Sequence, residues 1–420
     1  MKKLTSFLLL LSFFSCNKLI EYFPQPDPKP TPVLPVFNHN FGGQEYDAAN
    51  AIAATPDSGY LIVGTTQSND FDFSGNPNYP FSAPILIKLN KSGATEWIKM
   101  IAGADEFTAV AASPGGGYML AGKTINKGID ALVVKINEAG TVLWQKTLGG
   151  SAQDVASAIV ATPDGGCVMA GSTRSNDING KQGDESAWVV RLNNNGNIVW
   201  QTVFGGTNDE DRDWAKALTV APDGGYVLAG GSFRAATADQ ERAFHVLIAK
   251  LDNSGNLVWR QALALQAGAN AIIASNDGGF MLAGYIASDD NTSLDVLLMK
   301  VTGGGVLQWQ KLFGGSYEDI GTDITKGALG GYLVAASTES DDGDVTATHG
   351  KIDAWFIKVD NQGKMEWQHT RGGSQLDVPQ AVIGRPDGSF VAAGHTSSTD
   401  GDLKGSYGET DAWVLTIKKQ

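Results

Sequence analysis

The chain has 420 residues, of which 42% are hydrophobic and 18% are charged, so it can bury a large core and is not a disordered polypeptide. Its formal net charge of -14 at pH 7 repels phosphate backbones and anionic headgroups, which excludes nucleic acid as an expected partner. The 52 glycines, without a collagen-like triplet, indicate many tight turns and favour an all-β architecture.

The first 15 residues predict an export signal. Lys2 and Lys3 precede an apolar run that ends at Phe14, and a small residue stands directly before Cys16. This pattern resembles a bacterial lipoprotein signal, with Phe13 where that family usually has leucine. The resemblance implies cleavage before Cys16 and lipidation of its thiol; an ordinary cleaved secretory signal is the alternative. The apolar run is shorter than the ~20 residues that a transmembrane helix needs.

Residues 16–35 predict a proline-rich tether behind the lipidated cysteine. Its prolines prevent helix and ladder pairing and favour polyproline II: Pro24, Pro26, Pro28, Pro30, Pro32 and Pro35. In lipoproteins with such a signal, an aspartate after the cysteine often retains the protein at the inner membrane, so Asn17 implies an outer-membrane anchor. We therefore expect an exported protein that contacts the membrane only through its lipid, at the cell surface or facing the periplasm.

The rest of the chain, 36–420, consists of repeats of about 50 residues. The string NIVWQTVFGG at 197–206 recurs, with its tryptophan at Trp97, Trp144, Trp200, Trp259, Trp309 and Trp367. Each repeat also contains three short apolar runs, such as SAIVATPDGG, GCVMAGSTRS and SAWVVRLNNNG, which are bounded by turn residues. Four short runs rich in β-branched and aromatic residues predict four antiparallel strands per repeat. Cys167, the only cysteine besides Cys16, lies in one of these runs and is predicted to be buried.

Four-stranded units of this length predict the blades of a β-propeller. Complete sets of the first three strands begin near residues 47, 105, 154, 213, 267, 319 and 377, which gives seven blades. The seventh set ends before a fourth strand, but VFNHNF at 36–41 has the matching pattern, with Phe37 in the register of the tryptophans. The sequence therefore predicts a closed, seven-bladed ring whose last blade is completed by the N-terminal strand. The six indoles are predicted to act as wedges between blades.

The repeats of this chain resemble those of two known families. The strings KLNKSGATEW at 88–97 and KLDNSGNLVW at 250–259 are similar to the tryptophan-docking repeat of quinoprotein alcohol dehydrogenases. The whole repeat more closely resembles propeller-repeat surface lipoproteins of Bacteroidetes-type bacteria. The quinoprotein family has eight blades and holds its cofactor beside a vicinal cysteine pair. Since this chain has neither feature, that cofactor is not expected.

Acidic residues mark one end of the predicted ring. Connections from a fourth strand to the next first strand, and from a second to a third, emerge at the same end of a propeller; we call it the top rim and the opposite end the bottom rim. Six aspartates occupy equivalent places at the starts of first strands, with Ala267 in the seventh: Asp47, Asp105, Asp154, Asp213, Asp319 and Asp377. They either accept hydrogen bonds from backbone N–H groups of their turns or converge on the central channel to bind a cation or a basic partner.

The long loop at 70–78 suggests a metal site. Asp70, Asp72 and Ser74 alternate before Gly75, as in the first half of a calcium loop. Phe81 stands where a closing glutamate would be expected. Calcium bound at Asp70, Asp72 and Ser74 and a solvated loop with Asx turns are the two alternatives, and no other cofactor is expected.

Two functions fit this pattern. Aromatic side chains in the top-rim loops, namely Tyr79, Phe81, Trp214, Phe233 and Tyr407, could stack on sugars or on a protein. We therefore favour a non-catalytic binding or interaction platform on the cell surface, with an extracellular protein or glycan as its partner. The alternative is a hydrolase or lyase that acts on extracellular polysaccharide through top-rim carboxylates. No nucleophile motif or histidine cluster with metal spacing is present.

Overall fold

The computed structural model describes residues 36–125, 128–181, 183–206, 210–235, 242–288, 292–402 and 407–419. The predicted signal at 1–15 and the predicted tether at 16–35 therefore lie outside the described residues. Within the described residues, no helix has the length and apolar character required to cross a membrane.

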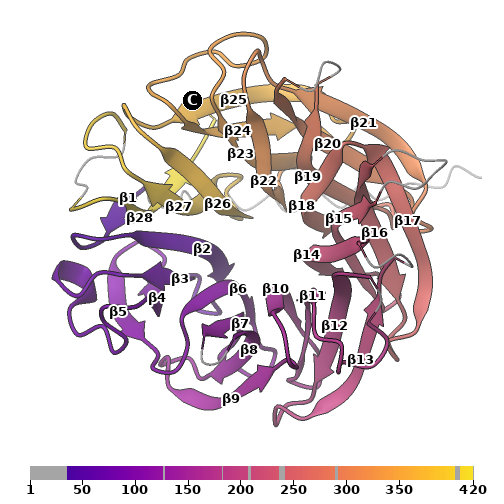
Figure 1. Ribbon diagram of the computed structural model, residues 1–420. Helices are drawn as coiled ribbons and strands as arrows, with labels where there is room; N and C mark the ends of the chain where they lie inside the picture. Colours follow the sequence, from indigo (N-terminus) through magenta and orange to yellow (C-terminus); the bar gives the residue numbers. More distant parts are fainter. Residues whose placement is uncertain are drawn as a thin grey trace, which may run out of the picture. The chain divides into compact units, whose positions relative to one another are not determined.

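Seven four-stranded antiparallel sheets stand around a central axis (Figure 1). The first strand of each sheet contacts the first strand of the next, and the last of them, β26 (Asp377–Gly384), contacts β2 (Asp47–Ala54), which closes the ring. The predicted seven-bladed β-propeller is therefore confirmed. Each blade therefore packs face to face between two neighbours.

The strands follow the chain order within each blade. Blade 1 contains β2 (Asp47–Ala54), β3 (Tyr60–Thr66), β4 (Ala83–Leu89) and β5 (Thr95–Met100), with the 3-10 helix η1 (Phe71–Phe73) between β3 and β4. Blade 2 contains β6 (Glu106–Ala112), β7 (Tyr118–Ile125), β8 (Ile129–Ile136) and β9 (Val142–Leu148). Blade 3 contains β10 (Asp154–Ala161), β11 (Cys167–Thr173), β12 (Ser186–Leu192) and β13 (Ile198–Phe204). Blade 4 contains β14 (Arg212–Val220), β15 (Tyr226–Arg234), β16 (Ala243–Leu251) and β17 (Leu257–Leu265).

The remaining blades continue the pattern. Blade 5 contains β18 (Ala267–Ala274), β19 (Phe280–Ala287), β20 (Leu294–Val301) and β21 (Leu307–Phe313). Blade 6 contains β22 (Asp319–Lys326), β23 (Tyr332–Thr338), β24 (Asp353–Val359) and β25 (Met365–Arg371). Blade 7 contains β26 (Asp377–Gly384), β27 (Phe390–Thr396), β28 (Asp411–Ile417) and β1 (Asn38–Phe41). Five first strands begin at the predicted residue, and β6 and β14 begin one residue away from it.

The N-terminal strand completes the last blade. β1 pairs antiparallel with β28, with Asn38 opposite Leu415 and Phe41 opposite Ala412. The backbone N–H of Thr416 also donates to the Phe37 carbonyl at 2.9 Å. The predicted closure between the two ends of the propeller is thus present in the strand register.

The recurring tryptophans join neighbouring blades at the bottom rim. The Trp97 ring of blade 1 packs on Gly140, in the turn between β8 and β9. The contact is so close that a Cβ atom added to this glycine would lie 2.8 Å from the ring. Trp144 lies 3.0 Å from the corresponding position on Gly196 and donates its Nε1–H to the Asn194 carbonyl at 2.8 Å. Each glycine has positive φ and no side chain, so the neighbouring indole can pack directly on the turn.

These indoles are not the buried wedges that the sequence predicted. All six lie on the outermost strands and are only half-buried, because no further strand covers that edge of the blade. The fully buried indoles are Trp188, Trp355 and Trp413, on the third strands. Cys167, on the second strand of blade 3, is fully buried as predicted, and burial raises the pKa of its thiol to about 12.

Every first strand carries one β-bulge at the same height. The register shifts between Ala49 and Ala51 in β2, and the other six first strands shift at the equivalent place. The residue within the shift is polar in all seven blades: Asn50, Thr108, Ser157, Lys216, Asn270, Thr322 and Gln380. These seven side chains line the central channel. The first strands are therefore interrupted by a polar residue, whereas the second and third strands are largely apolar and buried.

Candidate binding face

The top rim is braced by a motif, T-x-S-x-D, that ends the second strand of blades 1, 3, 6 and 7. It occupies residues 66–70, 173–177, 338–342 and 396–400. In blade 6, Ser340 Oγ accepts a hydrogen bond from the Tyr317 N–H at 3.0 Å and donates to Asp319 Oδ2 at 2.8 Å. Asp342 Oδ1 accepts the Ser316 N–H at 2.7 Å. The motif therefore ties the second strand to the turn that enters the same blade, and we call it the turn staple.

Four of the six predicted top-rim aspartates belong to these staples. Asp47, Asp154, Asp319 and Asp377 are fully buried, and each accepts the serine hydroxyl of its own blade's staple. Each also accepts the N–H of the second glycine in the preceding Gly-Gly pair, at 2.7 to 2.9 Å. Their carboxylates are therefore engaged inside the rim of their own blade and do not line the central channel.

The other two aspartates have different surroundings. Asp213 is fully buried between two arginines, with Arg260 Nη2 at 2.6 Å and Arg234 Nη2 at 3.1 Å from its carboxylate. Asp105 is half-buried and accepts the Ile125 N–H at 2.7 Å. Of the six, only Asp105 lines a cavity on the top rim.

Carboxylates meet across four blade boundaries, and at least one member of each pair is fully buried. Asp353 of blade 6 and Asp377 of blade 7 both lie against Gly372. A Cβ atom added to this glycine would be 2.1 Å from Asp353 Oδ1 and 2.8 Å from Asp377 Oδ2. Gly149 lies in the same way between Asp130 and Asp154, and Gly314 between Asp295 and Asp319. The fourth pair consists of Asp411 and Asp47.

Burial and proximity disfavour ionisation of these pairs. Burial, with a smaller contribution from Asp411, raises the pKa of Asp47 to about 6, although hydrogen bonds from Thr66 and Ser68 oppose the shift. Burial also raises the pKa of Asp353, and the neighbouring Asp377 adds to this effect. The pKa values of Asp130 and Asp295 are raised for the same two reasons. Two negative charges close together in a poorly solvated place repel each other. Protonation of one carboxylate of a pair therefore stabilises the fold.

Two of the three residues predicted to bind calcium accept hydrogen bonds from the turn that leads into blade 1. Asp70 Oδ1 accepts the Gln44 N–H at 3.0 Å, and Asp72 Oδ2 accepts the Gly42 N–H at 3.1 Å. Ser74 follows η1 and is exposed. Within the described residues, no three His, Cys, Asp or Glu side chains gather as a metal cage. Calcium binding at Asp70, Asp72 and Ser74 stays a prediction.

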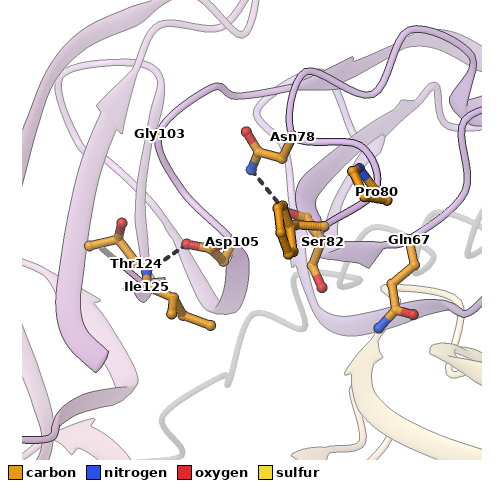
Figure 2. A pocket seen from close by; sticks show the side chains of 9 residues that line it. Gln67, Asn78, Pro80, Ser82, Gly103, Asp105, Thr124 and Ile125 are labelled. Atoms are coloured by element: carbon orange, nitrogen blue, oxygen red, sulfur yellow. Dashed lines mark hydrogen bonds between the residues drawn. The ribbon is translucent and has the colours of Figure 1, made fainter. Parts of the chain in front are cut away.

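One cavity on the top rim lies between blades 1 and 2 and has a volume of about 510 Å³ (Figure 2). Its walls come from the loop between β3 and β4, including Pro80 and Phe81, and from the end of β7, including Thr124 and Ile125. Asp105 lies at the boundary between these walls, with its carboxylate held by the Ile125 N–H. The cavity thus combines exposed apolar side chains with a few fixed polar groups, as ligand sites commonly do.

Asparagines hold the loop that forms one wall of this cavity. Asn78 Nδ2 donates to the Ser82 carbonyl at 2.8 Å and to the Ala104 carbonyl at 2.7 Å, which fastens the loop to the connection between blades (Figure 2). Asn76 Nδ2 donates to the Ser68 carbonyl at 3.1 Å. Between these anchors, the side chains of Tyr79 and Phe81 remain exposed.

A second cavity, of about 360 Å³, lies where blades 3 and 4 meet at the top rim. It is lined by Trp214, Phe233 and Phe244 together with Glu185 and Arg212. The rings of Phe233 and Phe244 lie 4.7 Å apart, and Trp214 is half-buried against Gly231. Tyr407, in blade 7, is exposed and lies against Phe71 of blade 1, with ring centroids 5.3 Å apart.

The exposed aromatic side chains of the described residues lie at one rim of the propeller. All six of the most exposed aromatic side chains in the described residues lie at the top: Phe71, Tyr79, Phe81, Phe244, Tyr317 and Tyr407. The exposed large apolar side chains of the bottom rim are all aliphatic: Val36, Val142, Leu143, Ile198, Val199, Val220, Leu257, Val258, Val306, Leu307 and Leu329. Ile125, Leu312 and Leu376 are exposed aliphatic side chains at the top, so only the exposed aromatic side chains are confined to one rim.

Sequence reasoning missed the turn staple, Phe244 and the ring of bulges. The staple was detectable, because T-x-S-x-D recurs at the same place in four repeats. The bulges were detectable only by aligning the seven repeats. All seven first strands then have a polar residue at the same position, and in six of them both neighbours of this residue are small or apolar. Phe244 carried no such signal.

We expect Ser340→Ala to destabilise the propeller by about 2 kcal/mol. The change leaves the Tyr317 N–H and one oxygen of the buried Asp319 without their partner, and such unsatisfied groups cost roughly 1–3 kcal/mol. Chemical denaturation of the variant measures the free energy of unfolding. Ser337→Ala, on the preceding strand and outside the staple, is the control; equal effects of the two changes would contradict a specific role for the staple.

Comparisons with known proteins identify the fold and no family. No protein-family model and no curated protein matches the chain. A catalytically inactive variant of virginiamycin B lyase from Staphylococcus aureus, solved with quinupristin, is 13% identical, with a TM-score of 0.51 over 91% of this chain and 100% of the other. The WD40 β-propeller domain of Doa1 is 12% identical, with a TM-score of 0.50 over 91% and 96%. A Bacteroides caccae protein of unknown function is 13% identical, with a TM-score of 0.40 over 68% and 89%. At such identities the similarity extends to the β-propeller fold alone.

Proposed function

We propose that this protein is an exported, lipid-anchored binding platform whose top rim holds an extracellular protein or glycan without transforming it. Its anchor is the lipidated Cys16, in the outer membrane, and residues 16–35 are the tether. The platform requires no cofactor.

The segregation of exposed aromatic side chains to the top rim carries this proposal. Aromatic residues supply large contact areas at low entropic cost and are enriched at the energetic centres of interfaces. Their faces also stack on sugars. Phe81 lines the cavity of about 510 Å³, and the exposed Tyr79 lies on the same loop. Asn76 and Asn78 hold this loop in place, so recognition would require little reordering.

The direction of β1 shows at which rim the described chain enters the propeller. Phe37, immediately before β1, packs on Gly93 in the turn between β4 and β5, which lies at the bottom rim. β1 then runs toward the top rim, where its last residue, Phe41, precedes the connection to β2. The described chain therefore enters the propeller at the rim opposite the exposed aromatic side chains.

An array of extracellular proteins and polysaccharide fragments tests the proposal. We expect the double variant Tyr79→Ala and Phe81→Ala to lose about tenfold or more in affinity for any partner that the unchanged protein retains, because truncating an aromatic anchor typically costs 1–2 kcal/mol or more. Leu329→Ala, which removes an exposed side chain at the bottom rim, is the matched control and should bind normally.

Two results would count against this function. Equal losses from the top-rim and bottom-rim variants would contradict binding through the top rim. Release of new reducing ends or unsaturated sugars from a retained glycan, abolished by Asp105→Asn with an unchanged melting temperature, would establish the hydrolase or lyase instead.

A further inference from the structure

The central channel contains a cavity that is distinct from the top-rim cavities. Its volume is about 360 Å³, and it is lined by residues from the first strands of all seven blades. The seven bulge residues described above form its wall, together with Glu106 and Val155. Since β-bulges re-aim side chains and occur preferentially next to functional sites, seven bulges at one height build a polar ring that regular strands would not provide.

Part of this ring is used to hold the blades together. Asn50 Nδ2 donates to the Glu106 carboxylate and to the Phe107 carbonyl of blade 2, both at 3.0 Å. Thr108 Oγ1 donates to the Ala156 carbonyl of blade 3 at 2.8 Å. Asn270 similarly reaches the Gly321 carbonyl of blade 6 at 2.9 Å. These three side chains therefore tie neighbouring blades together.

Of the other four side chains, Thr322 Oγ1 donates to the Ala335 carbonyl at 3.1 Å, and three are unengaged. Within the described residues, Ser157, Lys216 and Gln380 make no side-chain hydrogen bond or ion pair with protein, although all three line the cavity. Ser157 and Lys216 come from the adjacent blades 3 and 4, whereas Gln380 comes from blade 7, across the ring.

The charge of the cavity is also uneven. The acidic residue in the wall, Glu106, is neutralised by Lys123, whose Nζ lies 2.6 Å from its carboxylate, and by the bond from Asn50. Lys216 is the one cation of the cavity wall among the described residues, and it has no carboxylate partner there. The cavity of an acidic protein therefore presents a single uncompensated positive charge, surrounded by hydroxyl and amide groups.

From this arrangement we propose that the central channel binds a small, polyhydroxylated monocarboxylate of the sugar-acid class. Lys216 forms the ion pair with the carboxylate, while Ser157 and Gln380 bind hydroxyl groups on either side. A charge-assisted bond to a carboxylate is about twice as strong as a neutral one, so the acid is preferred to the corresponding neutral sugar. The wall has no exposed aromatic side chain, which distinguishes this ligand from one held by stacking on the top rim.

Titration calorimetry of the purified full chain with D-glucuronate tests this site, with D-glucose and inorganic phosphate as comparison ligands. We expect D-glucuronate to bind at least about tenfold more tightly than D-glucose. Lys216→Gln should reduce D-glucuronate affinity by about tenfold or more, and Lys216→Arg should restore most of it. Lys146→Gln, which removes an exposed lysine from the outer strand β9, is the control and should leave affinity unchanged.

Each contrary result would overturn the proposal. Absence of D-glucuronate binding at millimolar concentrations would remove the site, and equal affinity for D-glucose would remove the role of the charge. Phosphate binding that depends on Lys216, without D-glucuronate binding, would show a different ligand class. If Lys216→Gln does not fold, Gln380→Ala provides the second variant: it should weaken D-glucuronate binding several-fold with an unchanged melting temperature, and unchanged affinity would contradict the proposed contact.

Discussion

Deletion of residues 36–41 is expected to abolish cooperative folding of the whole propeller. This segment contains β1, the outer strand of blade 7, and Phe37, which packs on the bottom-rim turn of blade 1. Its loss exposes the edge of β28 and separates the two blades at which the ring closes. An open ring has two unpaired blade faces and an aggregation-prone edge, so the cost is not confined to one strand.

Circular dichroism during heating and size-exclusion chromatography would measure this effect. Deletion of 18–31, which leaves β1 in place, is the matched control and should melt like the full chain. Phe37→Trp should also be tolerated, because a tryptophan occupies the corresponding position on six other strands. A protein lacking 36–41 that melts with an unchanged midpoint would contradict closure by the N-terminal strand.

The second large effect concerns pH: stability should rise as the pH falls from about 7.5 to 5. The folded-state pKa of Asp47 is raised to about 6, above its ordinary value of 3.8, so the folded protein binds more protons than the unfolded chain in this interval. The free energy of unfolding therefore decreases as pH rises through the folded pKa. For Asp47 alone the difference between pH 7.5 and pH 5 is about 1.4 kcal/mol, and Asp130, Asp295 and Asp353 change stability in the same direction.

Stability should then fall again at more acidic pH. The hydrogen bond from Lys300 is the main reason why the pKa of Asp277 is lowered, so this carboxylate stabilises the fold while ionised and loses that contribution as it is protonated below about pH 4. Together, the two kinds of carboxylate predict a stability maximum in mildly acidic solution.

Melting temperatures of Asp47→Asn across this pH range test the assignment. The difference between pH 5 and pH 7.5 should shrink in this variant, whatever its absolute stability, because the titrating group is gone. Asp341→Asn removes an exposed aspartate of the same rim and should keep the normal pH dependence. An unchanged slope in Asp47→Asn would show that the pair of Asp47 and Asp411 does not titrate in this interval.

The repeat was sufficient to predict the fold, because each level of the pattern agreed with the others. Alternating apolar runs, turn residues and the displaced strand at 36–41 all required the same closed ring, and the register of β1 with β28 matches it. The indoles misled in one respect: a large aromatic residue was expected to be buried, but position within the blade decides burial. Trp188 on a third strand is covered from both sides, whereas Trp200 on a fourth strand is not.

The candidate sites were less predictable, since a residue type does not reveal where its side chain points. Asp154 and Asp319 have the chemistry of ligands, but the glycine pair before each strand and the serine of the staple enclose them. Lys216 lies between two alanines in a strand of period two, and only the bulge turns it toward the channel. Such a one-residue shift of register depends on pairing with β15, which is not local information.

The antiparallel pairing of β1 with β28 also determines how the molecule resists mechanical load. Ladder hydrogen bonds in an antiparallel pair lie perpendicular to the strands. A pull on the chain ahead of Phe37, opposed by a partner held at the other rim, acts along the axis of β1 and so shears all the bonds of this ladder at once. Peeling would break them one after another at lower force. The strand that closes the ring is thus also placed to carry tension through it.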